Sequence, residues 1–244
     1  MNIDRAGGRL PITLLAYAVA LALFLLVPPF LRGIVGPPAG FTQQEAADLL
    51  TPIVVIPLAW LVLEAAGGLR GVGRLAFLVI AAVWIEGQGI HLAANAIGDA
   101  FPKGGAEAFY VTPPGDLDLW LDEVLSHWMW HVAWVALTLL IAWVGLGARV
   151  RVERSGAWLV GLAALVHGVV FFFVTVEGVT TTLGLPACAG LLAWAGWGLR
   201  DGAGDRPVLR FIAESSAVTI GGYLGWAAAN AWALPEFSKV GLFG

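Results

Sequence analysis

The chain has few charged residues, and this scarcity limits the kind of protein that it can be. Only 12% of its 244 residues are Asp, Glu, Lys or Arg, whereas 59% are hydrophobic. An ordinary soluble domain carries about 25% charged residues, so this chain has too few to cover a water-facing surface. We therefore expect an integral membrane protein. The weak formal net charge of -4 gives no reason to expect a nucleic-acid partner.

Cysteine and lysine are also scarce. The only cysteine, Cys188, lies in an apolar stretch, so the chain has no internal disulfide framework. The two lysines, Lys103 and Lys239, lie outside the long apolar stretches. A rhodopsin-like protein that binds retinal through a lysine inside a span is therefore disfavoured.

Seven segments are apolar enough to cross a bilayer, which requires about 20 residues in each helix. They are residues 10–30, 43–66, 74–98, 118–147, 156–179, 183–199 and 207–231. The apolar run of the first is long for a signal peptide, so we interpret it as a retained helix. Thr42 and Glu45 have the spacing of a capping box at the start of the second. The sequence predicts an all-α bundle of about seven transmembrane helices that forms a single membrane domain over residues 1–244.

The basic residues are distributed unequally between the two ends of these segments. Only Arg32, Lys103 and Lys239 belong to one side. The other side has Arg5, Arg9, Arg70, Arg74, Arg149, Arg151, Arg154, Arg200, Arg206 and Arg210. By the positive-inside rule, the N-terminus is cytoplasmic and the C-terminus extracytoplasmic. We expect a multi-pass protein of the plasma or inner membrane.

All four histidines fall inside predicted spans, where ionisable groups are costly and usually face the bundle interior or a water-filled cavity. Glu123, His127 and His131 recur every four residues and share one stripe of a helix. Two histidines at this spacing can hold one metal ion. The alternative is hydrogen bonding between helices. Asp122 lies about 100° away around the helix, and we interpret it as an interfacial or capping charge.

The third predicted helix presents His91, Gln88 and Asn95 on one side, whereas Glu86 points about 140° away from His91. His91 and His127 lie about 10 and 13 Å from the outer ends of their helices. Consecutive antiparallel helices are usually neighbours, so the histidines of both helices are expected to meet. Gly87 and Gly89 would allow a close approach of another backbone.

Four histidines are therefore candidate metal ligands. His91, His127 and His131 would converge, with Glu123 above them and His167 below. Three imidazoles with a carboxylate or water suit zinc or ferrous iron. In a hydrolase, Glu123 would be the general base, and Glu86 or Asn95 would orient the ligands. The connection at residues 99–117 would then cover an outward-facing site, with Phe101, Phe109 and Tyr110 either gating entry or anchoring the loop at the interface.

The His127 and His131 pair also suggests a comparison with a known group. In this respect the chain resembles membrane zinc hydrolases of the alkaline ceramidase and adiponectin-receptor type, which combine seven helices with a three-histidine zinc site. In that group the pair lies on the last helix, whereas here it lies on the fourth. The accompanying Ser and Asp pattern is not evident. The resemblance covers only a few residues and implies no catalytic role for them.

The leading hypothesis is an intramembrane protein that binds a divalent transition metal, zinc or iron, through an outward-facing His and Glu site. As an enzyme, a hydrolase or an oxidoreductase, it would act on a lipidic or membrane-permeant substrate. Three alternatives remain open: a b-type haem electron-transfer protein, an ion- or proton-coupled transporter, and an accessory subunit of a membrane complex. The expected partners are the lipid bilayer, a lipidic or small-molecule ligand and, for a subunit, another membrane protein.

Overall fold

The computed structural model describes residues 3–31, 33–35, 42–99, 105–200, 202 and 206–242. Within these residues the chain is helical, and no strand forms apart from an isolated bridge between Ile34 and Thr42. The helices are α1 (Ile3–Leu26), η1 (Pro28–Phe30), α2 (Gln43–Ala65), α3 (Val72–Asp99), α4 (Gly105–Tyr110), α5 (Pro113–Trp120), η2 (Leu121–Ser126), α6 (His127–Gly147), α7 (Arg154–Glu177), α8 (Thr181–Leu199) and α9 (Pro207–Ala229). The capping box of Thr42 and Glu45 begins α2 as predicted.

Six helical segments of the described chain are long and apolar enough to cross a membrane. They are Gly8–Phe30, Gln43–Ala65, Val72–Gly98, Pro113–Gly147, Arg154–Glu177 and Thr181–Leu199. The seventh predicted span is the helix α9, which is equally long but is not among these six segments; besides the buried Ser215, Ser216 and Thr219 it contains the charged pair Arg210 and Glu214. The fold is that of a helical, multi-pass membrane protein. A seventh crossing and the orientation of the termini remain predictions.

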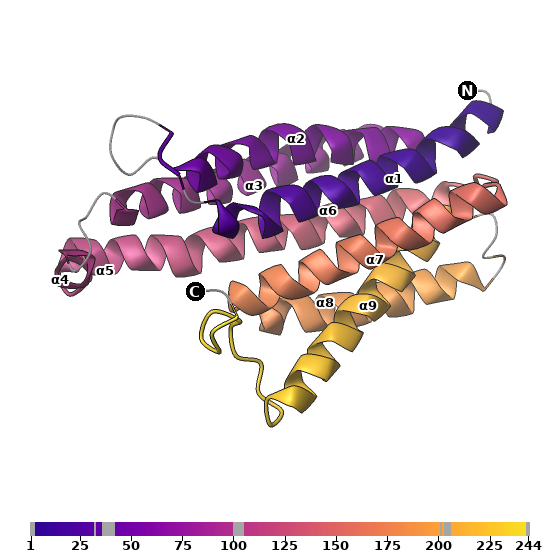
Figure 1. The fold of residues 1–244 in the computed structure, drawn as a ribbon. Coiled ribbons are helices and arrows are strands. Elements are labelled where there is room, and N and C mark those ends of the chain that lie inside the picture. Colours follow the sequence, from indigo (N-terminus) through magenta and orange to yellow (C-terminus); the bar gives the residue numbers. More distant parts are fainter. Residues whose placement is uncertain are drawn as a thin grey trace.

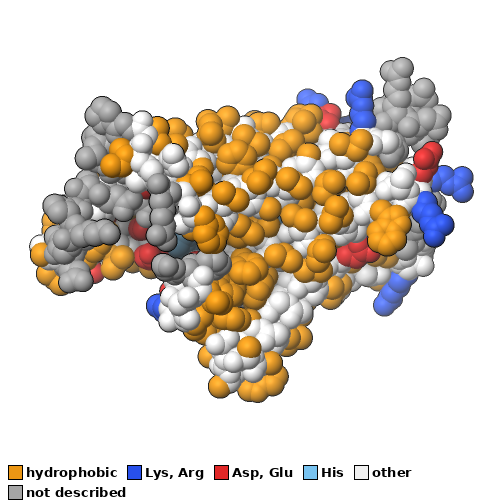
Figure 2. Space-filling model, viewed as in Figure 1, with side chains coloured by type: hydrophobic (Ala, Val, Ile, Leu, Met, Phe, Trp, Pro, Cys, Tyr) orange, Lys and Arg blue, Asp and Glu red, His pale blue; other side chains and the backbone are white. Residues whose placement is uncertain are grey.

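The outer surface of the bundle is apolar along its length. Large side chains such as Ile12, Ile53 and Leu78 are 61%, 60% and 63% exposed, and hydrophobic side chains dominate the visible face in Figure 2. A soluble monomer rarely exposes contiguous apolar surface of this extent. Contact with lipid acyl chains explains it.

The long helices form an antiparallel bundle, shown in Figure 1. The helix α1 packs against α2 and α7, α3 packs against α6, and α9 packs against α7 and α8. A Cβ atom on Gly87 would lie 2.9 Å from the Trp130 backbone nitrogen, so this glycine allows α3 to approach α6 closely. Gly89 has no heavy atom within 4 Å of that position. The predicted packing role therefore holds for Gly87 and is wrong for Gly89.

The fourth long helix begins earlier than the sequence predicted. Thr112 caps α5 by accepting a hydrogen bond from the Gly115 amide, and Pro113 occupies the first turn. The helix then continues through the π-helix η2 into α6. The connection between α3 and this helix is therefore shorter than the expected 99–117 loop, because residues 113–117 are already helical. Phe109 and Tyr110 belong to α4, and Phe101 lies outside the described residues.

Candidate functional site

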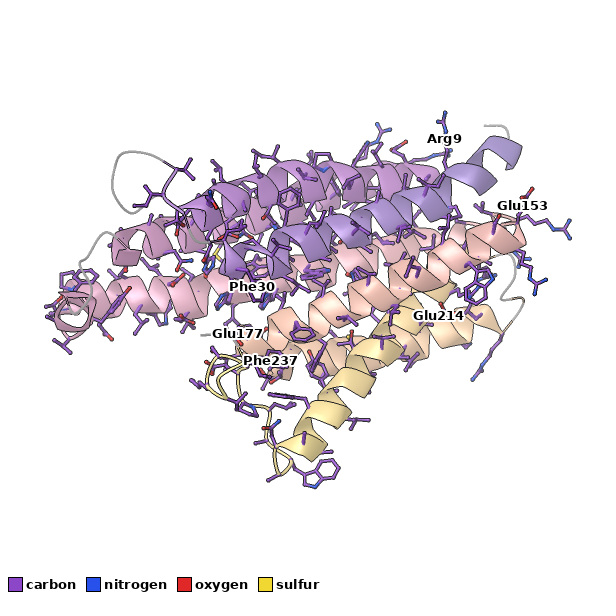
Figure 3. All side chains as sticks on the ribbon, in the orientation of Figure 1. Arg9, Phe30, Glu153, Glu177, Glu214 and Phe237 are labelled. Atoms are coloured by element: carbon purple, nitrogen blue, oxygen red, sulfur yellow. The ribbon has the colours of Figure 1, made fainter. Side chains whose placement is uncertain are left out.

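A polar cavity of about 280 Å³ lies at one end of the bundle. Its walls come from α1, α2, α3, η2, α6 and α7, together with Pro28, Pro29 and the segment after α9. In Figure 2 acidic side chains and a histidine are visible in a hollow at this end, whereas most Lys and Arg side chains gather at the opposite end. The labelled Arg9 and Glu153 in Figure 3 mark that opposite end.

The described lining of this cavity is strongly acidic. It has five carboxylates, and none of its residues is Lys or Arg. The five are Asp48, Asp122, Glu123, Glu177 and Glu236. Lys239 lies outside the lining and forms an exposed ion pair with Glu236, with 2.6 Å between Nζ and Oε1. That hydrogen bond raises the pKa of Lys239. Arg32 and Lys103, the other predicted outer cations, lie outside the described residues.

His91 and Asp122 form a close polar contact in the cavity. The Nδ1 atom of His91 lies 2.6 Å from the Oδ1 atom of Asp122, and the side chains are only 20% and 14% exposed. The two atoms are close without the alignment of a regular hydrogen bond. The Nε2 atom of His91 lies 3.0 Å from the Asn95 amide nitrogen, which can only donate. This pairing assigns the imidazole proton to Nδ1, beside the carboxylate.

The π-helix η2 explains why Asp122 reaches the cavity. Sequence spacing placed Asp122 about 100° from the stripe of Glu123 and predicted a capping or interfacial role, which is wrong. A π-helix closes i→i+5 hydrogen bonds and is therefore wider than an α-helix. Within η2 both Asp122 and Glu123 line the cavity. Such π-helical turns occur frequently at functional sites.

The structure brings three of the four candidate histidines together. The ring centroids are 5.1 Å apart for His91 and His127, and 5.7 Å apart for His127 and His131, whose rings are nearly parallel at 6°. The Nδ1–H group of His127 donates to the Glu123 carbonyl oxygen at 3.0 Å, which leaves the lone pair on Nε2. His131 pairs through Nδ1 with the Thr180 hydroxyl at 2.6 Å, and its buried Nε2 has no partner among the described residues.

Two predicted site residues are not part of this group. His167 lies on α7 and is buried against α6 and α9, where both ring nitrogens are paired: Nε2 accepts from Trp134 at 3.1 Å, and Nδ1 lies 2.6 Å from the Ser215 hydroxyl. Glu86 is exposed on α3 and does not belong to the described lining. Hydrogen bonding between helices accounts for His167. Asn95, rather than Glu86, orients a histidine.

A preformed metal site is not found within the described residues. No group of three or more His, Cys, Asp or Glu side chains in this part of the chain is arranged to hold a metal ion. Both ring nitrogens of His91 already have a polar neighbour. Among the three clustered histidines, only the Nε2 atoms of His127 and His131 therefore keep a lone pair that could bind a metal ion.

The segment after α9 supplies a wall that sequence reasoning missed. The Glu177 carboxylate accepts hydrogen bonds from the backbone amides of Phe237 at 2.8 Å and Ser238 at 3.3 Å. Phe237 is 2% exposed and packs on Phe173 with 4.6 Å between ring centroids. Figure 3 shows Glu177 and Phe237 close together at the cavity end. This clamp places Glu236 and Ser238 in the cavity wall.

Besides the two atoms of the His91 and Asp122 contact, two buried polar atoms of the lining residues have no hydrogen-bond partner within the described chain. They are the Oε1 atom of Gln88 and the Nε1 atom of Trp130, and these residues are 3% and 5% exposed. Buried polar groups are nearly always paired. Both residues belong to the cavity lining, so a ligand that reaches these atoms would supply the missing partners.

Asp48 is the remaining acidic residue that sequence reasoning missed. It is 7% exposed on α2, one turn after the capping box, and it lines the cavity near Gln44. An aspartate inside an otherwise apolar span was the available signal.

Comparison with known proteins assigns no family to this fold or cavity: no protein-family model, no curated protein and no solved structure matches the chain.

Proposed function

We propose that this multi-pass membrane protein binds a cation in the acidic cavity, which opens to the extracytoplasmic side. The observation that carries the proposal is the excess of five carboxylates over cationic side chains in the described lining. Within the described residues, Asp122 contacts His91 and Glu236 is paired with Lys239, whereas Asp48, Glu123 and Glu177 have no salt-bridge partner. A cation would reduce the mutual repulsion of the remaining carboxylates.

The surroundings of these carboxylates strengthen the preference of the cavity for a cation. Clefts lined by one sign of charge and enclosed by low-dielectric walls raise the local concentration of counter-ions and their association rates by about 10–10³-fold. Apolar side chains such as Leu25 and Val174 form part of the wall, and lipid would surround the bundle. The cavity end is also opposite the arginine-rich end, which the positive-inside rule assigns to the cytoplasm. Cations would therefore enter from outside.

An organic ammonium ion is the first candidate. The cavity volume of about 280 Å³ exceeds the needs of a bare metal ion. The unpartnered Oε1 atom of Gln88 accepts hydrogen bonds, which an ammonium group supplies. Nearby carboxylates make such hydrogen bonds charge-assisted and therefore stronger.

A transition metal is the second candidate, because His127 and His131 each carry an available Nε2 atom. Both rings are oriented through Nδ1, by the Glu123 carbonyl and the Thr180 hydroxyl. Such contacts fix the ring orientation of metal-binding histidines. Zinc or iron would need a third ligand, and Glu123 is the carboxylate on the same helical segment.

Titration of the purified protein in lipid nanodiscs tests the proposal. Butylammonium and Zn²⁺ would be titrated separately by calorimetry, with butyrate as the anionic counterpart. We expect butylammonium to bind and butyrate not to bind. Asp48→Asn should weaken butylammonium binding about tenfold or more, since a hydrogen bond to a charged group contributes about 1.5–3 kcal/mol.

Asp116→Asn is the matched control, because Asp116 is exposed on α5 and lies outside the described lining. It should leave the affinity for butylammonium unchanged. The absence of binding by both cations, or equal binding of butyrate, would contradict the proposal. Binding of Zn²⁺ alone, lost in His127→Ala, would favour the metal candidate.

A further inference from the structure

A second, apolar cavity adjoins the acidic one. It has a volume of about 270 Å³ and lies between the outer ends of α1 and α7, beside η1. Apart from Glu177, its described lining is entirely apolar: Leu25, Leu26, Pro29, Phe30, Phe173 and Val174. Figure 3 shows Phe30 and Glu177 near each other at this end of the bundle. We refer to it as the apolar groove.

The apolar groove and the acidic cavity share part of their walls. Leu25, Pro29, Val174 and Glu177 line both. Glu177 is held at this junction by its hydrogen bonds to the Phe237 and Ser238 amides. One ligand can therefore occupy both spaces, with its charged part in the acidic cavity and its apolar part in the groove.

We propose that the cation bound by this protein is the head group of a single-chain amphiphile, a long-chain alkylammonium ion, whose chain lies in the apolar groove. This inference rests on the proposed binding of a cation.

The groove lies beside the exposed surface of the bundle. Phe30 is 62% exposed at the groove. Leu23, one turn earlier in α1 than Leu26, is 54% exposed on the bundle surface. The groove thus adjoins the lipid-facing surface, and the chain can enter sideways from the outer leaflet.

The charge of the adjoining cavity distinguishes this ligand from the bulk lipid. A fatty acid or a phospholipid with an anionic head group would bring negative charge toward Glu177 and the other four carboxylates of the lining. Like charges brought together in a partly desolvated site repel. A cationic head group is instead attracted, and the unpartnered Oε1 atom of Gln88 can accept one of its N–H groups.

A chain-length series tests the inference. Butyl-, hexyl- and octylammonium would be titrated into nanodiscs with and without the protein, and partitioning into empty nanodiscs would be subtracted. Burial of apolar chain in the groove predicts an affinity gain of up to about fourfold per methylene group in the wild type. Octanoate should not bind above the empty-nanodisc level.

Leu26→Trp tests the groove itself, because a larger side chain at this lining position would fill it. This variant should retain the wild-type affinity for butylammonium and lose the gain with chain length. Leu23→Trp is the matched control on the same helix, since Leu23 lies outside the described groove lining. Leu23→Trp should preserve both the affinity for butylammonium and the gain in affinity with chain length. Size-exclusion profiles and thermal unfolding would establish that both variants are folded.

The outcomes separate the two proposals. Failure of butylammonium to bind the wild type would refute the cation proposal and this inference with it. Butylammonium binding without a gain for longer chains would refute the inference alone. The inference would also be overturned if Leu26→Trp kept the full gain in affinity with chain length, or if octanoate bound as tightly as octylammonium.

Discussion

The contact between His91 and Asp122 can be tested by a double-mutant cycle on stability. At a charge separation of about 4 Å and an effective dielectric constant of about 20, the Coulomb energy of a full ion pair is about 4 kcal/mol. This is an upper bound, because desolvation opposes it and because the 2.6 Å contact lacks the alignment of a regular hydrogen bond. We expect Asp122→Asn and His91→Gln each to reduce the free energy of unfolding by about 1.5–3 kcal/mol.

The double variant should lose less than the sum of the two single variants, with a coupling energy of about 1–2 kcal/mol. The free energy of unfolding would be measured by reversible denaturation in mixed detergent micelles. Asp116→Asn, an exposed substitution on α5, controls for the loss of a carboxylate near this end. Additivity of the single variants within about 0.5 kcal/mol would refute the coupling of His91 to Asp122.

Three further substitutions test the packing and the polar contacts around the site. Gly87→Ala should destabilise the protein by about 1–3 kcal/mol because the added Cβ atom meets the α6 backbone. Gly89→Ala, whose Cβ atom meets nothing within 4 Å, should not destabilise it. Equal free energies of unfolding for the two variants would contradict the close approach of α3 to α6. Ser215→Ala should cost about 1–3 kcal/mol by leaving a buried imidazole nitrogen unpaired, and an unchanged thermal unfolding curve would argue against that pairing. Glu177→Ala should release the segment after α9 and speed trypsin cleavage at Lys239, measured by mass spectrometry; an unchanged cleavage rate would show that the clamp contributes little.

The helices could be predicted closely because each depends on a local property of the sequence. A membrane helix requires a long apolar run, and a capping box requires two residues at a set spacing. The described α2 and α8 accordingly match the predicted segments within about two residues. The earlier start of the fourth helix depended on the cap by Thr112, which was not recognised among the turn-forming residues around it.

The site could be predicted only in part, because several of its contacts are not local. The convergence of His91 with His127 followed from helix order and depth. The role of Asp122 did not follow, because nothing in the sequence indicates the π-helix that widens the turn at residues 121–126. The wall that carries Glu236 depends on a clamp between residues 60 positions apart, Glu177 and Phe237, and no periodicity reveals such a contact.

The central claim, an acidic cavity that admits cations from outside, is tested most directly by the reactivity of a single cysteine in its wall. Gln44→Cys, in a background where Cys188 is replaced by serine, places a thiol in the described lining. Cationic and anionic methanethiosulfonate reagents would be applied to each side of sealed vesicles, with Gly202→Cys as the control at the opposite end. The account predicts that the cationic reagent modifies the Gln44→Cys thiol about tenfold faster or more than the anionic one, and only from the extracytoplasmic side. Equal rates for both reagents, or modification only from the cytoplasmic side, would contradict it.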